Sequence, residues 1–295
     1  MIKSRLLPRE FNAGLGMIYI IMLFMCLATL YPFLYVIAYA FSNAKSAIIN
    51  IITILPVDFT FNNFKVVFGN SMIYTSMLIS VMRTVLGTLY AIIVTGLASY
   101  SISRTYPGRR VLSIMLIIPM YISGGMIPYY VVLSQLGLFN NFLVYILPLG
   151  FSAYYMLLMR TFFEGVPESL HESARLDGAG ELTIFLRIIV PLSMPIIATI
   201  AMFSGVMQWN SWFDGMVYVS RPQLRPMATL IQEMLHRFET SDLRRAIEQQ
   251  VRDSTTSPES VKMATIVVST VPIICVYPFL QKYFIKGVMI GAVKA

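Results

Sequence analysis

Long apolar runs separated by short polar segments dominate the chain. A helix that crosses the hydrocarbon core of a bilayer needs roughly 20 mostly apolar residues. Six runs reach or approach that length: Leu15–Phe41, Met72–Ser103, Val111–Leu133, Phe142–Met159, Ile188–Phe213 and Met263–Leu280. The pattern therefore predicts an all-α integral membrane protein with six transmembrane helices. Prolines within or at the ends of these runs predict kinks, which membrane bundles tolerate.

The first run has two possible interpretations. Three basic residues precede it, and Ala38-Tyr39-Ala40 is similar to a signal-peptidase cleavage site. However, the apolar region of a signal peptide spans about 7–15 residues, and this run is nearly twice that length. We therefore predict an uncleaved first transmembrane helix.

Composition supports the membrane class, chiefly because charged residues are scarce. They make up 12% of the chain and hydrophobic residues 57%, against about 25% and 45–50% in soluble domains, and the mean hydropathy is +0.72. The net charge of +8 could suggest nucleic acid, but the basic residues flank apolar runs, so we expect membrane lipid and no nucleic acid as a partner. Cys26 and Cys275 both lie in apolar runs, so neither a disulfide nor a metal site is expected.

Lysine and arginine set the expected orientation, because short cytoplasmic loops are rich in them. With six spans, four basic segments fall on one side of the membrane: the N-terminal segment, the loops around 104–110 and 160–187, and the C-terminal segment. Both termini are therefore expected to be cytoplasmic. The predicted domains are 1–71 (first helix and an external loop), 72–285 (the membrane domain) and 286–295 (a cytoplasmic tail). An external loop, 214–260, is inserted before the last helix, and its segment Met227–Glu239 has helical periodicity.

A polar, acid-rich segment, Glu168–Glu181, lies between the fourth and fifth runs and can begin a helix after Pro167. Its composition leaves two possibilities open: a helix that only links two spans, or a surface for a protein partner. Small Ser173 and Ala174 would allow close approach by such a partner. The segment also carries a spaced pattern, Glu-x-Ala-x3-Gly-x9-Ile-x-x-Pro, formed by Glu172, Ala174, Gly178, Ile188 and Pro191.

This spacing resembles the "EAA" loop of the permease subunits of bacterial ATP-binding-cassette (ABC) importers. The resemblance implies a type I ABC importer permease fold with a cytoplasmic coupling helix between helices four and five, docked into a separate ATPase. The implied coupling residues are Glu172, Ser173, Ala174, Asp177, Gly178, Ile188 and Pro191. Ser173 stands where the family pattern has alanine.

The resemblance extends over most of the chain and is to the carbohydrate-uptake branch of these permeases. Arg175–Glu181 and Trp209–Asp214 look most like subunits that import complex oligosaccharides and polysaccharide fragments, of the alginate or lipo-oligosaccharide type. The implied setting is a multi-pass protein of the bacterial inner membrane. Its implied partners are a second homologous permease, an ABC ATPase dimer that binds ATP and Mg, and a periplasmic or extracellular sugar-binding protein.

The chain itself is not expected to be an enzyme or to bind a cofactor. It has no Gly-x4-Gly-Lys-Ser/Thr phosphate-binding loop, and its two histidines are too few for a metalloprotease site. The alternative from another class is an ion-coupled secondary transporter. Such transporters usually need buried carboxylates, and none of the 14 acidic residues is expected well inside a span.

Sugar sites combine aromatic platforms with amide or carboxylate groups. The end of the fifth run offers Gln208, Trp209, Asn210, Trp212 and Asp214. Gln208 and Trp212 are spaced to share one helix face. An interfacial aromatic belt is the alternative explanation of both tryptophans.

Two further candidates lie in other runs. One is the set Tyr121, Ser123, Gly124, Gly125 and Tyr129, which could contact sugar, although glycines in membrane helices also serve close packing. Arg83 is the only charge well inside a run. It is either functional or close enough to the external end to extend its guanidinium to the interface.

Overall fold

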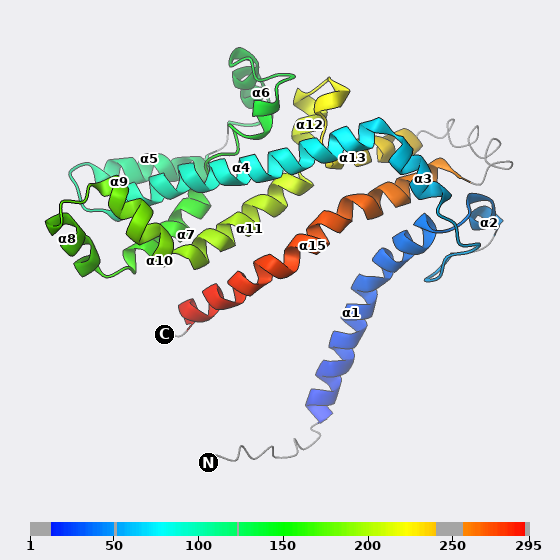
Figure 1. The fold of residues 1–295 in the computed structure, drawn as a ribbon, viewed down its shortest axis with the longest axis horizontal. Helices are drawn as coiled ribbons and strands as arrows, with labels where there is room; N and C mark the ends of the chain where they lie inside the picture. Colours follow the sequence, from blue (N-terminus) through cyan, green and yellow to red (C-terminus); the bar gives the residue numbers. More distant parts are fainter. Residues whose placement is uncertain (1–12, 50–51, 123, 240–255, 293–295) are drawn as a thin grey trace. The chain divides into compact units, whose positions relative to one another are not determined.

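The structure is a computed structural model that describes residues 13–49, 52–122, 124–239 and 256–292. The chain divides into two compact units, Met1–Gly69 with Phe238–Val267, and Asn70–Arg237 with Val268–Ala295. Helices form almost all the regular structure of the described residues (Figure 1). The predicted all-α class is therefore confirmed.

The first unit contains α1 (Ala13–Ala40), α2 (Ala44–Ile49), α3 (Asn62–Gly69) and the beginning of α15 (Pro258–Ala292). Asn63 is its polar centre. The Asn63 amide donates to the Ala40 carbonyl at 2.8 Å and the Ser42 carbonyl at 2.9 Å, and it accepts from the Ser260 hydroxyl at 2.8 Å. The end of α1 and the start of α15 are thus joined through one buried side chain.

The second unit is built on α4 (Ser71–Ser103), against which α7 (Ala153–Glu164) and α11 (Met194–Asn210) pack. Small residues allow the close approach of α4 and α11: Gly87 lies against the Gln208 side chain, and Gly205 faces Thr84 and Thr88. The other elements of the unit up to residue 239 are α5 (Arg109–Tyr121), α6 (Met126–Gln135), η1 (Phe142–Tyr145), α8 (Glu168–Leu176), α9 (Glu181–Ile184), η2 (Phe185–Ile189), α10 (Val190–Leu192), α12 (Phe213–Tyr218), η3 (Pro222–Leu224) and α13 (Met227–Glu239).

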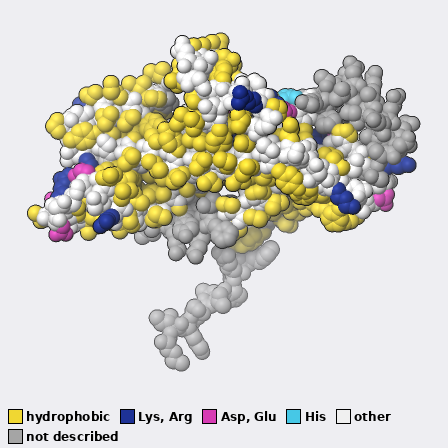
Figure 2. All heavy atoms as spheres, turned by 45° about the horizontal axis from the view of Figure 1, so that its top comes forward, with side chains coloured by type: hydrophobic (Ala, Val, Ile, Leu, Met, Phe, Trp, Pro, Cys, Tyr) yellow, Lys and Arg dark blue, Asp and Glu magenta, His cyan; other side chains and the backbone are white. Residues whose placement is uncertain are grey.

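Three described helices are long and apolar enough to cross a membrane: Gly14–Ala40, Ser71–Ser103 and Pro258–Val276. They correspond to the first, second and sixth predicted runs. Their apolar side chains are largely exposed, and none of the most apolar window of α1 is buried, as expected for surfaces that face lipid. In Figure 2, hydrophobic side chains cover most of the visible face, and the acidic and basic side chains form small, separate groups.

Two further runs are bent, in agreement with the kinks that their prolines predict. The third run divides into α5 and α6. Helical geometry ends at Ile122, whose backbone is extended, and Gly125, with a φ of +82°, directly precedes α6. The fifth divides at Ser193 into Glu181–Leu192 and Met194–Asn210, which meet at 83°. Pro195 lacks the N–H that would continue the helix there. Counting each bent pair as one span gives up to five spans among the described residues.

The fourth run, Phe142–Met159, is not one helix either. It begins with the short 3-10 turn η1, and its α-helix, α7, starts only at Ala153, where the Ser152 hydroxyl accepts from the Tyr155 N–H. Gly150, in the intervening loop, lies against the Tyr90 ring, where a Cβ atom would approach to 2.0 Å. A larger residue at this position would therefore clash with Tyr90 unless the ring moved.

The predicted external loop, 214–260, has structure of its own. It contains α12, η3 and α13, and α13 has the bounds predicted from the sequence, Met227–Glu239. Its backbone is tied to α4, because the Ser80 hydroxyl accepts from the Met227 N–H at 2.7 Å. Residues 240–255 of this loop, and the predicted basic N-terminal residues before Ala13, lie outside the described residues.

Candidate functional site

The polar segment between the fourth and fifth runs forms α8, which begins after Pro167 as predicted. It ends at Leu176, where Asp177 and then Gly178, with a φ of +81°, reverse the chain. The Ala179 N–H donates to the Ala174 carbonyl at 2.9 Å, which closes the last turn. Glycine reaches this left-handed conformation without strain, so it is suited to the end of a helix.

One face of α8 packs onto the protein and the other is open. His171 and Ala174 are buried, whereas Glu172, Ser173 and Leu176 are exposed. The Leu176 side chain is 88% exposed, which is unusual for a large apolar residue outside a lipid-facing helix. The exposed surface of α8 is thus mostly polar, and Leu176 is its most exposed apolar residue.

Behind α8 lies a buried polar cluster that sequence reasoning missed. The Tyr100 hydroxyl, from α4, is 2.8 Å from the His171 Nε2 atom and 2.6 Å from a carboxylate oxygen of Glu181. Burial lowers the pKa of His171, and the nearby Arg104 guanidinium lowers it further. His171 is therefore expected to be neutral at physiological pH. The residues are far apart in sequence, so no local spacing could have revealed them.

A second buried polar cluster surrounds Arg83, whose side chain is 0% exposed. Its guanidinium donates to Asp214 Oδ2 at 2.6 Å and Oδ1 at 3.2 Å, to the Ser211 carbonyl at 3.0 Å and to Gln208 Oε1 at 3.1 Å. It also lies 4.5 Å from the centre of the Tyr145 ring. The possibility that Arg83 extends to an interface is therefore wrong, because groups on α11, the loop after it and α12 pair fully with the guanidinium.

The structure brings together only some of the predicted sugar-contacting residues. Gln208 and Asp214 meet at Arg83, but α11 ends at Asn210, so the predicted shared helix face of Gln208 and Trp212 was wrong. Trp212 packs edge-on against Phe213, and the Asn210 amide donates to the Val206 carbonyl of its own helix. Trp209 is half-buried on α11, and Tyr121 is 78% exposed at the end of α5.

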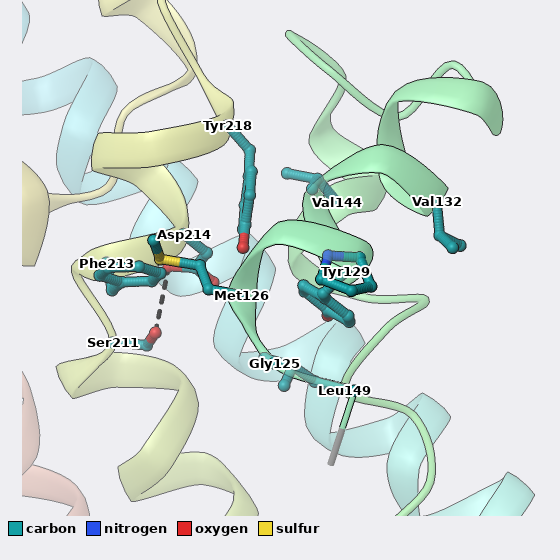
Figure 3. Close-up of a pocket in the computed structure, with 12 residues that line it drawn as sticks. Gly125, Met126, Tyr129, Val132, Val144, Leu149, Ser211, Phe213, Asp214 and Tyr218 are labelled. Atoms are coloured by element: carbon teal, nitrogen blue, oxygen red, sulfur yellow. Dashed lines mark hydrogen bonds between the residues drawn. The ribbon is translucent and has the colours of Figure 1, made fainter.

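A cavity of about 650 Å³ opens between α6 and the α11–α12 segment (Figure 3). Its lining is mostly apolar: Gly124, Gly125, Met126, Pro128, Tyr129, Val132, Val144, Leu149, Ser211, Phe213, Asp214 and Tyr218. Figure 3 shows the rings of Tyr129, Phe213 and Tyr218 around it, with Asp214 accepting from Ser211. The volume is that of an ordinary small-molecule site. Asp214, Tyr129 and the two glycines of the sequence analysis line this cavity, whereas Tyr121 does not.

Comparison with known proteins decides the family. The family model described as "binding-protein-dependent transport system inner membrane component" matches residues 87–290. The chain belongs to this family. It is therefore an inner-membrane component of an ABC transport system, as predicted, and a binding protein is among its partners. The alternative of an ion-coupled secondary transporter is not supported.

Relatives of this permease match almost end to end. The polygalacturonan/rhamnogalacturonan transport system permease protein YtcP of Bacillus subtilis (strain 168) is 34% identical over 279 residues, which cover 94% of this chain and 97% of YtcP. Protein LplC of the same organism is 36% identical over 267 residues, 90% of each chain. Among solved structures, a chain of a bacterial ABC transporter involved in the import of the acidic polysaccharide alginate matches with a TM-score of 0.84 and 29% identity. That match covers 95% of this chain and 100% of the other.

In this permease the residues of the coupling motif serve different structural purposes. Glu172, Ser173, Asp177 and Gly178 are exposed on α8 and the turn after it, and Pro191 is exposed in α10. Ala174 and Ile188 instead pack against a core cluster that includes Tyr100, Phe163 and Phe185. The expectation that Ala174 allows close approach by a partner was therefore wrong, because its methyl group is covered by this chain.

Proposed function

We propose that the chain is one of two homologous permease subunits through which a complex saccharide enters the cell by alternating access. ATP and Mg are bound by a separate ATPase dimer, and an external binding protein delivers the saccharide. The proposal rests mainly on α8, which is exposed on one face and is followed by the turn at Gly178. Two residues of the motif, Ala174 and Ile188, pack in the core behind it. The printed names of the relatives, polygalacturonan/rhamnogalacturonan permease and alginate importer, support a polysaccharide fragment as the substrate.

The exposed face of α8 is the proposed docking surface for the ATPase. Leu176 provides an apolar side chain, and Glu172 and Asp177 provide negative charge beside it. Apolar anchors surrounded by polar groups are the usual centre of a protein interface. Movement of α8 with the ATPase would then rock the bundle between outward-open and inward-open states.

The proposed topology has six spans with both termini cytoplasmic, and the predicted domain boundaries 1–71, 72–285 and 286–295 are kept. It is supported by basic residues near α8: Arg104 pairs with Glu168 at 2.9 Å, and Arg109 and Arg160 both pair with Glu164. Single cysteines at Ser103 and Ser220, in a variant lacking Cys26 and Cys275, test this topology. An impermeant thiol reagent should label only the Ser220 position in intact spheroplasts, and labelling of both positions would contradict the proposed span count.

The cavity beside Asp214 is the proposed saccharide contact in this subunit. Aromatic rings can stack on the apolar faces of sugars, and the carboxylate can accept from their hydroxyl groups. Arg83 and Gln208 do not line the cavity; they hold Asp214 from behind. A uronate group of the substrate would therefore not meet the Arg83 guanidinium. Trp209, Asn210, Trp212 and Tyr121 lie outside the cavity lining and have no proposed role in this contact.

Purification from the native membrane tests the proposed function. The permease should co-purify with an ATPase, and proteoliposomes of the complex should take up an oligogalacturonide or a matched neutral oligogalactose only with ATP and binding protein. Phe213→Ala should lower uptake without changing basal ATPase activity, whereas Phe24→Ala, on the exposed surface of α1, serves as the control. Uptake driven by an ion gradient without ATP would refute the proposal.

A further inference from the structure

The Tyr100 hydroxyl joins three helices at one point. It comes from α4, and it contacts His171 of α8 and Glu181 of α9 at 2.8 and 2.6 Å. Tyr100 and His171 are both buried, at 8% and 1% exposure. Since a hydroxyl has only one hydrogen, the two contacts fix the direction of each hydrogen bond.

The short contact with the carboxylate indicates that Tyr100 donates to Glu181. His171 must then donate from Nε2 to the Tyr100 oxygen, which places the imidazole hydrogen on Nε2. The buried His171 Nδ1 atom has no hydrogen-bond partner among the described residues. A nitrogen without a hydrogen is tolerated there better than an unpaired N–H donor, so the arrangement is internally consistent.

Other contacts also tie α8 to its neighbours, but they are more exposed. Arg175 donates to Glu181 at 3.0 Å, with both side chains more than half exposed, and Arg104 pairs with the largely exposed Glu168. Exposed ion pairs contribute little, because water competes for both charges. The buried Tyr100–His171 contact is therefore the polar tie that best fixes α8 on α4.

The same helix carries the second polar cluster in its N-terminal half. Arg83 precedes Tyr100 in α4 by about 25 Å along the axis, at a rise of about 1.5 Å per residue, and the helix is uninterrupted from Ser71 to Ser103. Arg83 is bound to Gln208 and Asp214, and Asp214 lines the cavity. One continuous helix thus has a buried polar junction to α8 near its C-terminal end and a buried polar junction to the cavity wall in its N-terminal half.

We propose that Tyr100 is the positioning residue that transmits movement of α8 to α4, and through Arg83 to the cavity wall. The proposal rests on the proposed role of α8 in docking the ATPase. Removing the hydroxyl leaves the ring packed against Phe185, at 5.0 Å between ring centres, so the fold and the docking surface are kept. What is lost is the defined orientation of α8 relative to α4.

The test uses the complete complex with its co-purified ATPase and binding protein, reconstituted in proteoliposomes. Tyr100→Phe should keep basal ATPase activity within about twofold of wild type, and should lower both the stimulation by saccharide-loaded binding protein and the saccharide transported per ATP by about tenfold. Tyr90→Phe is the matched control, because Tyr90 is on the same helix and its hydroxyl makes no hydrogen bond among the described residues. Wild-type stimulation in Tyr100→Phe would overturn the proposal.

A second pair of variants keeps the test independent of Tyr100 itself. His171→Gln places an amide donor near the former Nε2 position and should retain most of the stimulation, whereas His171→Leu should lose it. Equal activity of these two variants would overturn the proposal, as would loss of the ATPase from both Tyr100→Phe and His171→Leu complexes. If the wild-type chain binds no ATPase, the proposed function fails instead, and the two failures are distinguishable.

Discussion

The buried pair of Arg83 and Asp214 provides the sharpest stability prediction. Substituting Asp214 by Asn keeps the shape of the side chain but removes the negative charge that pairs with a fully buried guanidinium. Arginine stays charged in proteins, and the Arg83 side chain is 0% exposed. Asp214→Asn therefore leaves an uncompensated positive charge in the interior of the bundle.

The size of the effect follows from the burial and the number of contacts. Breaking a buried ion pair by removing one partner costs about 3–5 kcal/mol. The remaining acceptors, the Ser211 carbonyl and Gln208 Oε1, satisfy hydrogen bonds but supply no full charge. The reverse change, Arg83→Met, should lower the free energy of unfolding by less, because the Asp214 side chain is 13% exposed and lines the cavity, where water can solvate it. The double variant, Asp214→Asn with Arg83→Met, should be more stable by about 2 kcal/mol or more than the sum of the two single changes in the free energy of unfolding would give.

Stability of the purified protein in detergent can be followed by SDS titration with helical circular dichroism as the signal, for wild type, both single variants and the double variant. Asp214→Glu serves as a control that keeps the charge. The reasoning would be refuted if Asp214→Asn were as stable as wild type, or if the free energies of the single changes were additive. Either result would mean that Arg83 is neutralised or hydrated in another way.

Three further predictions concern α8 and the interface of α4 with α11. Gly178 has a φ of +81° with open space around it, so a substitution there is limited by backbone conformation and not by lack of space. Gly178→Asn should keep more binding-protein-stimulated ATPase activity than Gly178→Val. Equal activity of the two variants would refute this. Burial lowers the pKa of His171 in the folded state, so as the pH falls the unfolded state takes up a proton on this residue before the folded state does. The contribution of neutral His171 to the free energy of unfolding should therefore be complete above about pH 6.5. It should be lost as the pH falls through the lower pKa of the folded state. Thermal unfolding of wild type against His171→Gln at several pH values tests this, and parallel curves would contradict it. Gly87→Ala should lower the free energy of unfolding by about 1–3 kcal/mol, because the added carbon would lie 2.5 Å from Gln208 Nε2. Gly205→Ala should change it little, because the nearest neighbour of the added carbon is 3.6 Å away. The SDS titration described above measures both changes.

Local sequence patterns correctly predicted the helices whose residues form one uninterrupted apolar or amphipathic run. The bounds of α1, α4 and α13 agree with the predicted runs to within two residues, because uninterrupted apolar or amphipathic helices satisfy their own backbone hydrogen bonds. The start of α8 after Pro167 was also predicted correctly, since proline restricts the backbone at a single position. The motif spacing from Glu172 to Pro191 pointed to the family, which the comparison confirmed.

Prolines within the runs predicted that the helices bend, but the hydropathy pattern gave neither the residue at which a bend occurs nor its angle. Ile188–Phe213 contains the 83° bend at Ser193 without any change in hydropathy. The end of α11 at Asn210 was missed for the same reason, and with it the position of Trp212.

By itself, the sequence determined the membrane class and the all-helical architecture, because these depend on composition and periodicity, and the spacing from Glu172 to Pro191 indicated the permease family. Only the tertiary structure decided which polar residues meet. Arg83 is joined to Asp214 across 131 positions, and Tyr100 to His171 across 71. Such pairs form because a buried polar group must find its partner within the protein, and the partner is whichever residue the packing of α4 against α8 and α11 brings within reach.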